Sequence, residues 1–323
     1  MSRWHAGCLA WLLGCGHVWA QPQPQLLPQA PGPVSLEEVV VSGERAGPGL
    51  WHVYRGPAQL WLLGTVLPLP KDMTWRSKQV EAILGGTDSL LVAKLVDISL
   101  PRALWLMMTQ RSLMMAGKGK TLKDVMSPEL HARFALQRAR FTKDADKWER
   151  YRPIVAAEFL QEEAFKQAGL STSLDVGEEV RSMARKHHVR IDEFKVAGWR
   201  DVLDALKSIP ATTESLCVAA SLSITESGLA RLAERGAAWA TGNIERIQSQ
   251  PQPPELTACR TAIMSDAGAA DIYAQLKRAW IENMNRHLQS GGVTLAAVSM
   301  DMLLEPDGLL QQLRALGYTV DAP

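Results

Sequence analysis

Apolar and polar residues alternate in two short runs near the start of the foldable chain, residues 50–54 (LWHVY) and 59–66 (QLWLLGTV). Alternation with a period of two predicts β-strands. Residues 55–58 between them (RGPA) are typical of a turn, so the two runs are expected to form a β-hairpin. A short helix is expected over 77–84, ended by two glycines, and a mostly apolar strand over 89–96 (SLLVAKLV), as in a sheet covered on both faces.

The middle of the chain changes from a period of two to a helical period. Apolar residues recur there every three or four positions, which predicts amphipathic helices. One interruption, residues 189–196 (VRIDEFKV), reads as a strand that returns to the sheet. The expected helices cover residues 103–116, 128–141, 146–168, 177–186, 199–207, 227–239, 255–264 and 270–289.

The end of the chain is again α/β. A strand is predicted over 293–299 (VTLAAVS), an amphipathic helix over 307–316 ended by Gly317, and a last strand over 318–320. A crossover of this length places the two strands parallel. The predicted fold class is therefore α/β, with a central mixed sheet built from both ends of the chain and a large helical middle lobe.

Composition narrows the class of protein. With 323 residues and 46% hydrophobic residues the chain can bury a large core. The net charge of +1 gives no basic field for nucleic acid and no acidic field for cationic partners. We therefore expect no nucleic-acid partner.

The first 20 residues have the form of an export signal. Arg3 precedes an apolar run, and Val18-Trp19-Ala20 before Gln21 matches a small-x-Ala cleavage site. A lipoprotein box ending at Cys15 is the alternative, although Leu13 is large for that box. No other run reaches the 18 or so apolar residues of a membrane span. The mature chain is expected to be periplasmic or secreted, without a transmembrane segment.

A linker rich in proline and glutamine follows the signal over residues 21–48. It is too poor in packing residues to fold, although residues 39–41 (VVV) could form an edge strand or tether. The folded domain is expected to span residues 49–323.

Two cysteines remain after cleavage, Cys217 and Cys259. An even pair in an oxidising compartment favours a disulfide, the alternative being two separate buried thiols. A metal site at this pair would lack nearby histidines.

Four segments resemble the TraB/GumN family. They are LWLLGT at 60–65, DSLLV at 88–92, AAWATGNIERI at 237–247, and above all the tail VTLAAVSMDMLLEPDGLLQQLRALGYTV at 293–320. Their order and spacing match the family over nearly all of residues 49–323. Animal proteins distantly similar to this family, of the Tiki type, are metal-dependent proteases, so the resemblance implies a site at the exit of the first long strand.

The residues that the resemblance credits with metal binding and catalysis are missing. After Gly64 and Thr65 the family's G-T-x-H pattern has Leu67 in place of histidine, and Met302 replaces the histidine of its V-G-A-x-H-L tail. Ala93, beside Lys94, stands where the family has glutamate. Leucine and alanine cannot ligate a metal and a thioether binds only soft ions, so no catalytic residue, metal or cofactor is expected. We expect apolar packing to fill the vacated positions.

Two carboxylates could rebuild a site near the same strands. Glu193 could face the cleft, or lie on the surface paired with Lys195. Asp301 could serve as a ligand, or cap the loop or helix that follows the last long strand.

Three functions remain open on these grounds. The first is an exported, catalytically inactive TraB/GumN-like protein that binds an unknown protein, small molecule or glycan in the envelope. The second is a hydrolase of the metal-dependent peptidase kind with a site rebuilt from Asp301 and Glu193. The third is an accessory role in surface polysaccharide production, which the family name suggests by gene neighbourhood and not by chemistry.

Overall fold

A computed structural model describes residues 47–96, 101, 105, 108–173 and 176–323 of the chain. The expected signal, the linker up to residue 46 and part of the helix expected over 103–116 lie outside the described residues. In the described part of that last segment Trp105, Met108 and Thr109 are helical, and a short 3-10 helix, η1 (Arg111–Leu113), follows them.

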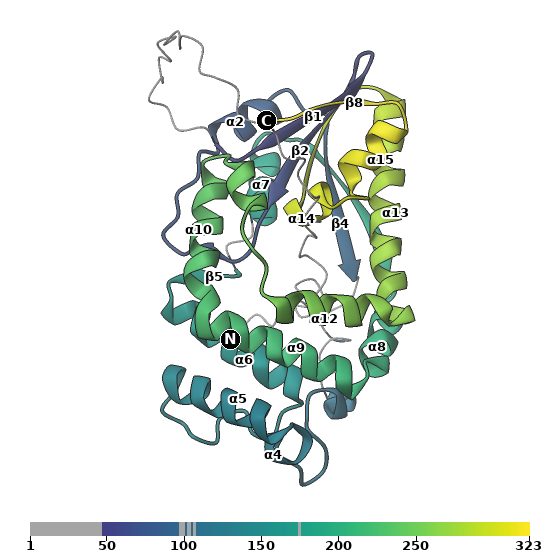
Figure 1. Ribbon diagram of the computed structural model, residues 1–323. Coiled ribbons are helices and arrows are strands. Elements are labelled where there is room, and N and C mark those ends of the chain that lie inside the picture. The colour runs from purple at the N-terminus through teal and green to yellow at the C-terminus, as the bar shows by residue number, and fades with distance from the viewer. Residues whose placement is uncertain (1–46, 97–100, 102–104, 106–107, 174–175) are drawn as a thin grey trace, which may run out of the picture.

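A six-stranded mixed sheet forms one end of the molecule, in the order β6-β4-β7-β2-β1-β8 (Figure 1). β3 and β5 form a separate two-stranded sheet, in which β3 contacts α10 (Leu229–Ala240) and β5 contacts α6 (Pro153–Gln167). The strands are β1 (Leu50–Arg55), β2 (Ala58–Thr65), β3 (Leu69–Pro70), β4 (Ser89–Val96), β5 (Leu170–Ser171), β6 (Arg190–Ala197), β7 (Val293–Ser299) and β8 (Thr319–Asp321). The fold class expected from the sequence is confirmed.

The register of the sheet sets which strand ends meet. β1 and β2 form the predicted antiparallel hairpin. β2, β7, β4 and β6 are all parallel, so their carboxyl ends lie along one edge, here called the carboxyl edge, and their amino ends along the opposite amino edge. β8 runs in the same direction as β7, as predicted, but pairs with β1, so β2 and β1 separate the two strands.

Helices cover both faces of this sheet. α7 (Val176–Lys186) contacts β6 and β7 on one face, and α2 (Lys78–Leu84) packs against α7. α13 (Ala267–Ser290) contacts β2, β4 and β6 on the other face. Side chains alternate between the faces along each strand. Phe194 of β6 meets Trp280 of α13 edge to face, with ring centroids 4.9 Å apart, which assigns Phe194 and its register partner Ala93 to the α13 face.

Helices from the middle of the chain build a second layer beneath the carboxyl edge (Figure 1). They have their own apolar core, formed mainly by side chains of α5, α6 and α9, in which Phe134, Leu160 and Leu222 are fully buried. The helices are α2 (Lys78–Leu84), α4 (Leu122–Val125), α5 (Pro128–Phe141), α6 (Pro153–Gln167), α7 (Val176–Lys186), α8 (Trp199–Ser208), α9 (Ala211–Ser223), α10 (Leu229–Ala240), α11 (Ile244–Gln248), α12 (Pro254–Ser265), α13 (Ala267–Ser290), α14 (Met300–Leu304) and α15 (Leu309–Ala315). The helical middle lobe is therefore confirmed.

Two helices of this lobe differ from the sequence expectation. α6 begins at Pro153 and not at residue 146, because residues 145–150 form turns and a proline fits the first turn of a helix. α9 was not anticipated. It continues through a π-helical turn, Ile224–Gly228, into α10, so that one helical rod runs from Ala211 to Ala240.

This rod is also the one helix among the described residues that is long and apolar enough to cross a membrane by length and composition. That is weak evidence for a span, since the core helix of a soluble protein passes the same test. Val218, Leu222 and Trp239 of the rod are fully buried against other helices and the sheet. Packing inside the protein accounts for the apolar character of these three positions.

A disulfide joins Cys217 of α9 to Cys259 of α12, with the Cα atoms 4.6 Å apart. The bond closes a sequence separation of 42 residues and fastens two helices of the lobe to each other. The predicted pairing is confirmed in the structure.

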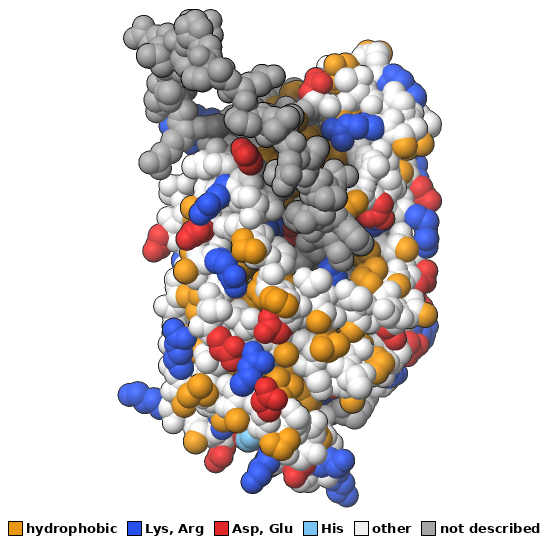
Figure 2. Space-filling view, in the orientation of Figure 1, with side chains coloured by type: hydrophobic (Ala, Val, Ile, Leu, Met, Phe, Trp, Pro, Cys, Tyr) orange, Lys and Arg blue, Asp and Glu red, His pale blue; other side chains and the backbone are white. Residues whose placement is uncertain are grey.

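The visible surface carries side chains of both charge signs intermixed, with apolar side chains in small groups (Figure 2). No single-sign field covers the described part of that face. This agrees with a net charge of +1.

Candidate functional site

Gly64 and Thr65 lie where β2 reaches the carboxyl edge. The Gly64 carbonyl accepts a hydrogen bond of 2.6 Å from Nε1 of the buried Trp239 in α10. Thr65 Oγ1 donates to the Val298 carbonyl of β7 at 3.2 Å. A Cβ added at Gly64 would lie 2.8 Å from the Met300 thioether, closer than real contacts allow. A side chain at position 64 would therefore force the buried Met300 or Trp51 side chain to shift, and the Gly64 carbonyl is already engaged.

The three positions vacated by the family motif have different surroundings. Met302 is 6% exposed and belongs to the main apolar core. Ala93 is half-buried and packs against the same core. Leu67, in the loop after β2, keeps 42% of its surface exposed. Apolar packing has thus filled two of the positions, and the expectation is wrong for the third because Leu67 lies on the surface.

Asp301 lies in the first turn of α14, directly after β7. It forms an ion pair of 2.6 Å with Arg235 of α10, and the side chains are 21% and 12% exposed respectively. Ser299 occupies the N-cap position and makes no side-chain cap hydrogen bond. Asp301 is therefore not the N-cap residue of α14: it lies two residues after Ser299, and its carboxylate pairs with Arg235.

A second carboxylate, Glu305, follows one turn after Asp301, with its backbone N–H bonded to the Asp301 carbonyl at 2.9 Å. The Tyr273 hydroxyl donates to Glu305 at 2.8 Å, Arg260 Nη2 donates at 3.1 Å, and Lys277 Nζ lies 3.0 Å away. Only 5% of the Glu305 side chain is exposed. Sequence reasoning missed this cluster. A repeat of acids four residues apart was the one available signal.

The electrostatics of the cluster keep its donors protonated. Burial, followed by the charge of Glu305, raises the pKa of Tyr273 far above its usual value. Burial acts to lower the pKa of Lys277, but hydrogen bonds to Asp307 and Glu305 outweigh it and the pKa is raised. A phenol and an ammonium held in these states serve as donors to Glu305 and not as bases.

One donor of the cluster has no protein acceptor. Arg260 is 7% exposed, and its Nη1 atom is buried without a hydrogen-bond partner among the described residues. The other terminal nitrogen of the same guanidinium is bonded to Glu305. A buried donor without an acceptor lowers stability. The hydrogen-bonding groups of the cluster are therefore nearly all paired, with this one exception among the described residues.

Glu193 does not join these residues. Its register partner on β4 is Val92, so Glu193 and Lys94 lie on the face opposite Ala93 and α13. Its carboxylate is 40% exposed and forms an ion pair with Arg181 of α7, a partner that the sequence did not suggest. Asp301 contacts α10 instead. The two carboxylates proposed for a rebuilt site are thus paired with different helices, Glu193 with α7 and Asp301 with α10.

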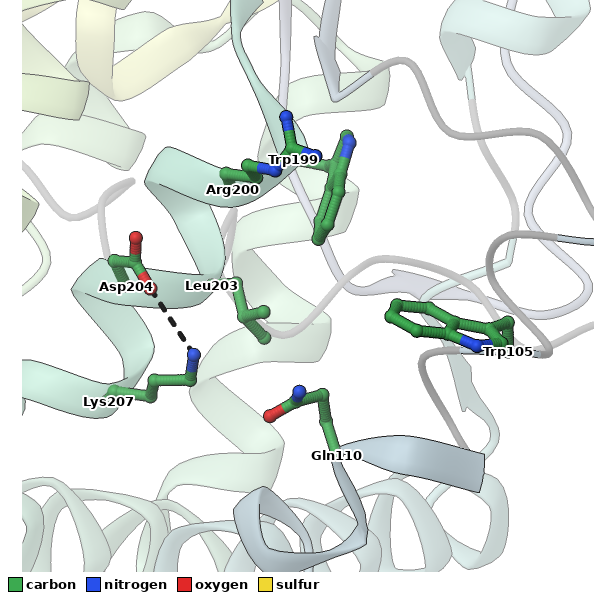
Figure 3. A pocket seen from close by; sticks show the side chains of 7 residues that line it. All are labelled: Trp105, Gln110, Trp199, Arg200, Leu203, Asp204 and Lys207. Atoms are coloured by element: carbon green, nitrogen blue, oxygen red, sulfur yellow. Dashed lines mark hydrogen bonds and ion pairs between the residues drawn. The ribbon is translucent and has the colours of Figure 1, made fainter.

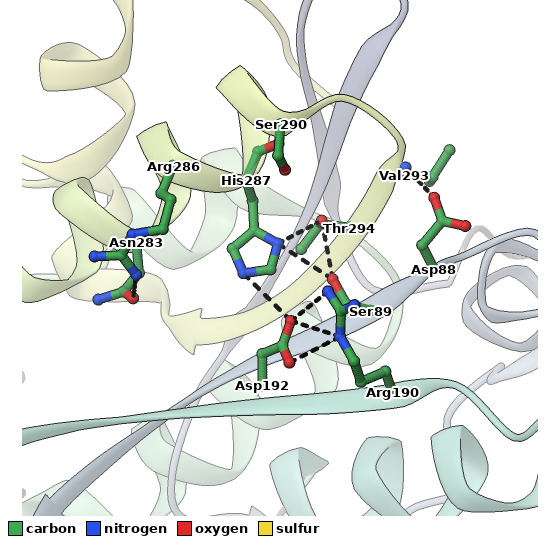
Figure 4. Close-up of polar contacts among 10 residues, drawn as sticks. All are labelled: Asp88, Ser89, Arg190, Asp192, Asn283, Arg286, His287, Ser290, Val293 and Thr294. Atoms are coloured by element: carbon green, nitrogen blue, oxygen red, sulfur yellow. Dashed lines mark hydrogen bonds and ion pairs between the residues drawn. The ribbon is translucent and has the colours of Figure 1, made fainter.

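A different polar cluster lies at the amino edge (Figure 4). His287 Nδ1 of α13 is 3.2 Å from both Ser89 Oγ of β4 and Thr294 Oγ1 of β7. His287 Nε2 is 3.5 Å from Asp192 of β6, which Arg190 also holds. The set has the composition of a Ser-His-Asp triad. Its elements come from distant parts of the chain, so the sequence pattern gave no sign of it.

The serine of this amino-edge cluster is too deeply buried to act as a nucleophile. Ser89 is 1% exposed and its hydroxyl is shared between His287 and Thr294. Burial lowers the pKa of His287, which keeps the imidazole neutral. A serine buried in this way cannot be reached by a substrate and cannot act as a nucleophile. The contacts instead have a structural role, because they hold α13 against β4, β6 and β7.

No group of three or more His, Cys, Asp or Glu side chains that could hold a metal ion occurs among the described residues. The fold is that of an α/β protein, and the carboxylates Asp301, Glu305 and Asp192 at the two edges of the sheet each lie against a cationic or histidine side chain. A family model matches residues 49–322, and the chain belongs to the TraB/PrgY/gumN family. Comparisons with curated proteins and with solved structures found no match.

Proposed function

We propose that this chain is a non-catalytic member of its family that acts outside the cytoplasm and binds a ligand or partner there. The observation that carries the proposal is the pairing of the acids at the carboxyl edge. Asp301 lies against Arg235, and Glu305 is held by three donors. A carboxylate that is already paired with cationic donors in this way is a poor ligand for a further cation.

The vacated motif positions support the same proposal. Met302 and Ala93 pack into the main core, and Leu67 offers no lone pair. A hydrolytic metal needs nitrogen or oxygen ligands and an open position for water. The three side chains provide none of these ligands.

Metal content and peptidase activity test the proposal directly. The purified mature chain should hold no stoichiometric metal ion by elemental mass spectrometry. It should also leave a peptide library uncleaved with added Mn²⁺, Co²⁺ or Zn²⁺. About one tightly held ion per chain, or cleavage that Asp301→Asn abolishes, would contradict it.

Restoring the family residues is a sharper test. The triple variant Leu67→His, Ala93→Glu, Met302→His should show no peptidase activity, because metal sites also need partners that orient each ligand. We expect a loss of about 1–3 kcal/mol for each polar group buried without a partner, at positions 93 and 302 and not at the exposed position 67. The single variant Leu67→His is the matched control for stability. Stoichiometric metal binding with cleavage would instead mark a recently silenced enzyme.

A hydrolase rebuilt from Asp301 and Glu193 is the competing proposal. It needs the two carboxylates at one place, whereas Glu193 pairs with α7 and Asp301 with α10. The geometry favours the binding protein.

Export is tested at the amino terminus. Mass spectrometry of protein from the envelope fraction should find a mature chain that begins at Gln21. The variant Cys15→Ser should leave this start unchanged. A lipid-modified start at Cys15 would mean a membrane-anchored chain, and an intact Met1 in the cytoplasmic fraction would contradict export.

A further inference from the structure

Charge is distributed unevenly along a chain whose net charge is close to zero. Residues 111–152 contain eleven Lys and Arg and five Asp and Glu, whereas the whole chain contains 35 and 34. The rest of the chain is therefore net acidic. The basic stretch includes α4 and α5, which form the end of the helical lobe farthest from the six-stranded sheet (Figure 1). A charge asymmetry of this kind indicates a surface for an oppositely charged partner.

Part of the basic stretch is neutralised inside the lobe. Arg133, Arg138 and Arg152 each form an ion pair with a glutamate. The cations at the end of the lobe form no ion pair with other described residues and are at least partly exposed: Lys118, Lys120, Lys123, Arg140, Lys143, Lys147 and Arg150. We call residues 117–124 and 140–150 the lobe tip. Its exposed acids are Asp124, Asp144 and Asp146, so positive charge prevails there.

The fold joins the two segments of the lobe tip. The Ala116 N–H donates to the Arg150 carbonyl at 3.0 Å, and the Leu122 N–H donates to the Glu149 carbonyl at 2.7 Å. Residues 117–121 therefore lie beside residues 148–150. Gly117 and Gly119 have φ angles of 120° and 73°, which suit glycine, and the lysine after each of them is exposed. Cations distant in the sequence thus share one surface.

An aromatic side chain lies within this basic surface. Trp148 is half-buried, and Lys147 Nζ lies 4.6 Å from the centre of its ring. The φ angle of Trp148 is 70°, a left-handed conformation that bulky residues rarely adopt. Tryptophan with neighbouring lysines is typical of membrane–water interfaces, where the indole lies at headgroup level and the ammonium groups reach the polar layer.

We propose that the lobe tip docks this protein onto an anionic phospholipid surface. Negative headgroups complement the positive charge of the tip, and each Lys or Arg close to such a surface strengthens the attraction. Five of the seven cations are lysines, compact charges that lack the planar fork with which arginine binds a single phosphate. That composition suits a diffuse layer of headgroups. The inference does not depend on the proposed loss of catalysis.

A small molecule is a poorer fit for this surface. Pockets for small ligands are concave and mostly apolar. A hollow of about 200 Å³ opens beside α8, and none of the seven cations of the lobe tip borders it (Figure 3). A soluble acidic polymer shares the charge of the headgroups, so the test must separate a polymer from a membrane.

The test is co-sedimentation of the purified chain that begins at Gln21 with lipid vesicles. One set of vesicles contains phosphatidylcholine alone, and the other contains phosphatidylcholine and phosphatidylglycerol in equal parts. We expect binding to the anionic vesicles only. The binding should be lost as ionic strength rises from about 0.05 M to about 0.5 M, because salt screens exposed charges.

Single charge removals should weaken this binding in steps. Lys118→Gln and Lys120→Gln should each lower the partition coefficient about fivefold, whereas Lys118→Arg and Lys120→Arg should retain it. Lys186→Gln is the matched control, because Lys186 is an exposed lysine at the end of α7, at the amino edge of the sheet. It should leave binding unchanged. Circular dichroism would verify that each variant is folded.

Three results would overturn the proposal. The first is equal binding to the two kinds of vesicle, or binding to neither. The second is a partition coefficient that Lys118→Gln and Lys120→Gln leave unchanged. The third is tighter binding to heparin than to the anionic vesicles through the same lysines, which would identify an acidic polymer as the partner. Metal content and peptide cleavage are measured separately, so failure of the proposed function remains distinguishable from failure here.

Discussion

The two edges of the sheet hold polar clusters of opposite electrostatic character. At the carboxyl edge Glu305 is charged, buried and surrounded by Arg260, Lys277 and Tyr273. At the amino edge His287 is neutral, and it joins Ser89 to Asp192. Burial of a full charge is tolerated only with opposite charges around it, whereas a neutral imidazole needs only hydrogen-bond partners. The two clusters should therefore respond differently to mutation and to pH.

Removal of the central acid should give the largest effect. Glu305→Gln leaves Arg260 and Lys277 buried with less compensation, so the free energy of unfolding should fall by about 3–5 kcal/mol. Urea denaturation measures the change. The matched control is Glu234→Gln, since Glu234 is 56% exposed in its ion pair with Arg246 and should contribute less than about 1 kcal/mol. Equal losses in the two variants would show that the carboxyl-edge cluster carries no special stability.

Breaking the disulfide tests how far the carboxyl-edge cluster depends on its supporting helices. The bond fixes α12, which carries Arg260, to α9. The double variant Cys217→Ala, Cys259→Ala should lose about 2–4 kcal/mol of stability, the usual range for a loop of this size. If the cluster needs this support, the losses from the double variant and Glu305→Gln should not add when combined. Mass mapping that finds both thiols free in the exported protein would contradict the bond itself.

Hydroxyl deletion at the amino edge should cost less. Ser89→Ala removes one partner of His287 but leaves Thr294 at the same distance from Nδ1, so we expect a loss of about 0.5–1.5 kcal/mol. The double variant with Thr294→Val should lose more than the sum of the single variants, because Nδ1 then has neither hydroxyl. A double variant as stable as the parent would mean that the histidine contacts contribute nothing.

The smallest expected effect is on the pH dependence of the free energy of unfolding. Burial lowers the pKa of His287 below 6.5, against the attraction of Asp192 and with the help of Arg190 and Arg286. The unfolded chain therefore binds more protons just below pH 6.5, and this histidine's contribution to stability should be lost as pH falls through that region. His287→Gln should remove this component of the pH dependence, measured by urea denaturation between pH 7.5 and about 5. A difference between parent and variant that does not change with pH would contradict it.

The contribution of Glu158 to the pH dependence of stability must be separated from that of His287, because the two contributions have opposite signs. Burial, followed by the charge of Glu162, raises the pKa of Glu158 from 4.5 to about 7. Its protonated form then favours the folded state, and that contribution is lost as pH rises through about 7. Glu158→Gln provides the background in which the His287 component is read alone.

Local sequence determined those helices and strands whose signals lie within a few neighbouring residues. Alternation predicted β1 and β2, and apolar spacing predicted a helix over 128–141, which is α5; its N-cap Ser127 accepts the Leu130 N–H with Oγ at 3.2 Å. The family resemblance located the strand exit at Gly64 and the vacated positions. The start of α6 was wrong and α9 was absent from the expectation, because apolar spacing does not separate a helix from turns or measure its burial.

Only the tertiary structure decided which polar groups meet. Glu305 takes its donors from residues 32 and 45 positions away, and Ser89 finds His287 across 198 positions. Strand order placed β8 beside β1, and register placed Glu193 and Ala93 on opposite faces. Propensity and hydrophobic period act over a few residues, whereas ion pairs and packing depend on which distant segments the fold brings within bonding distance. The charged and neutral clusters at the two edges are therefore properties of the folded chain.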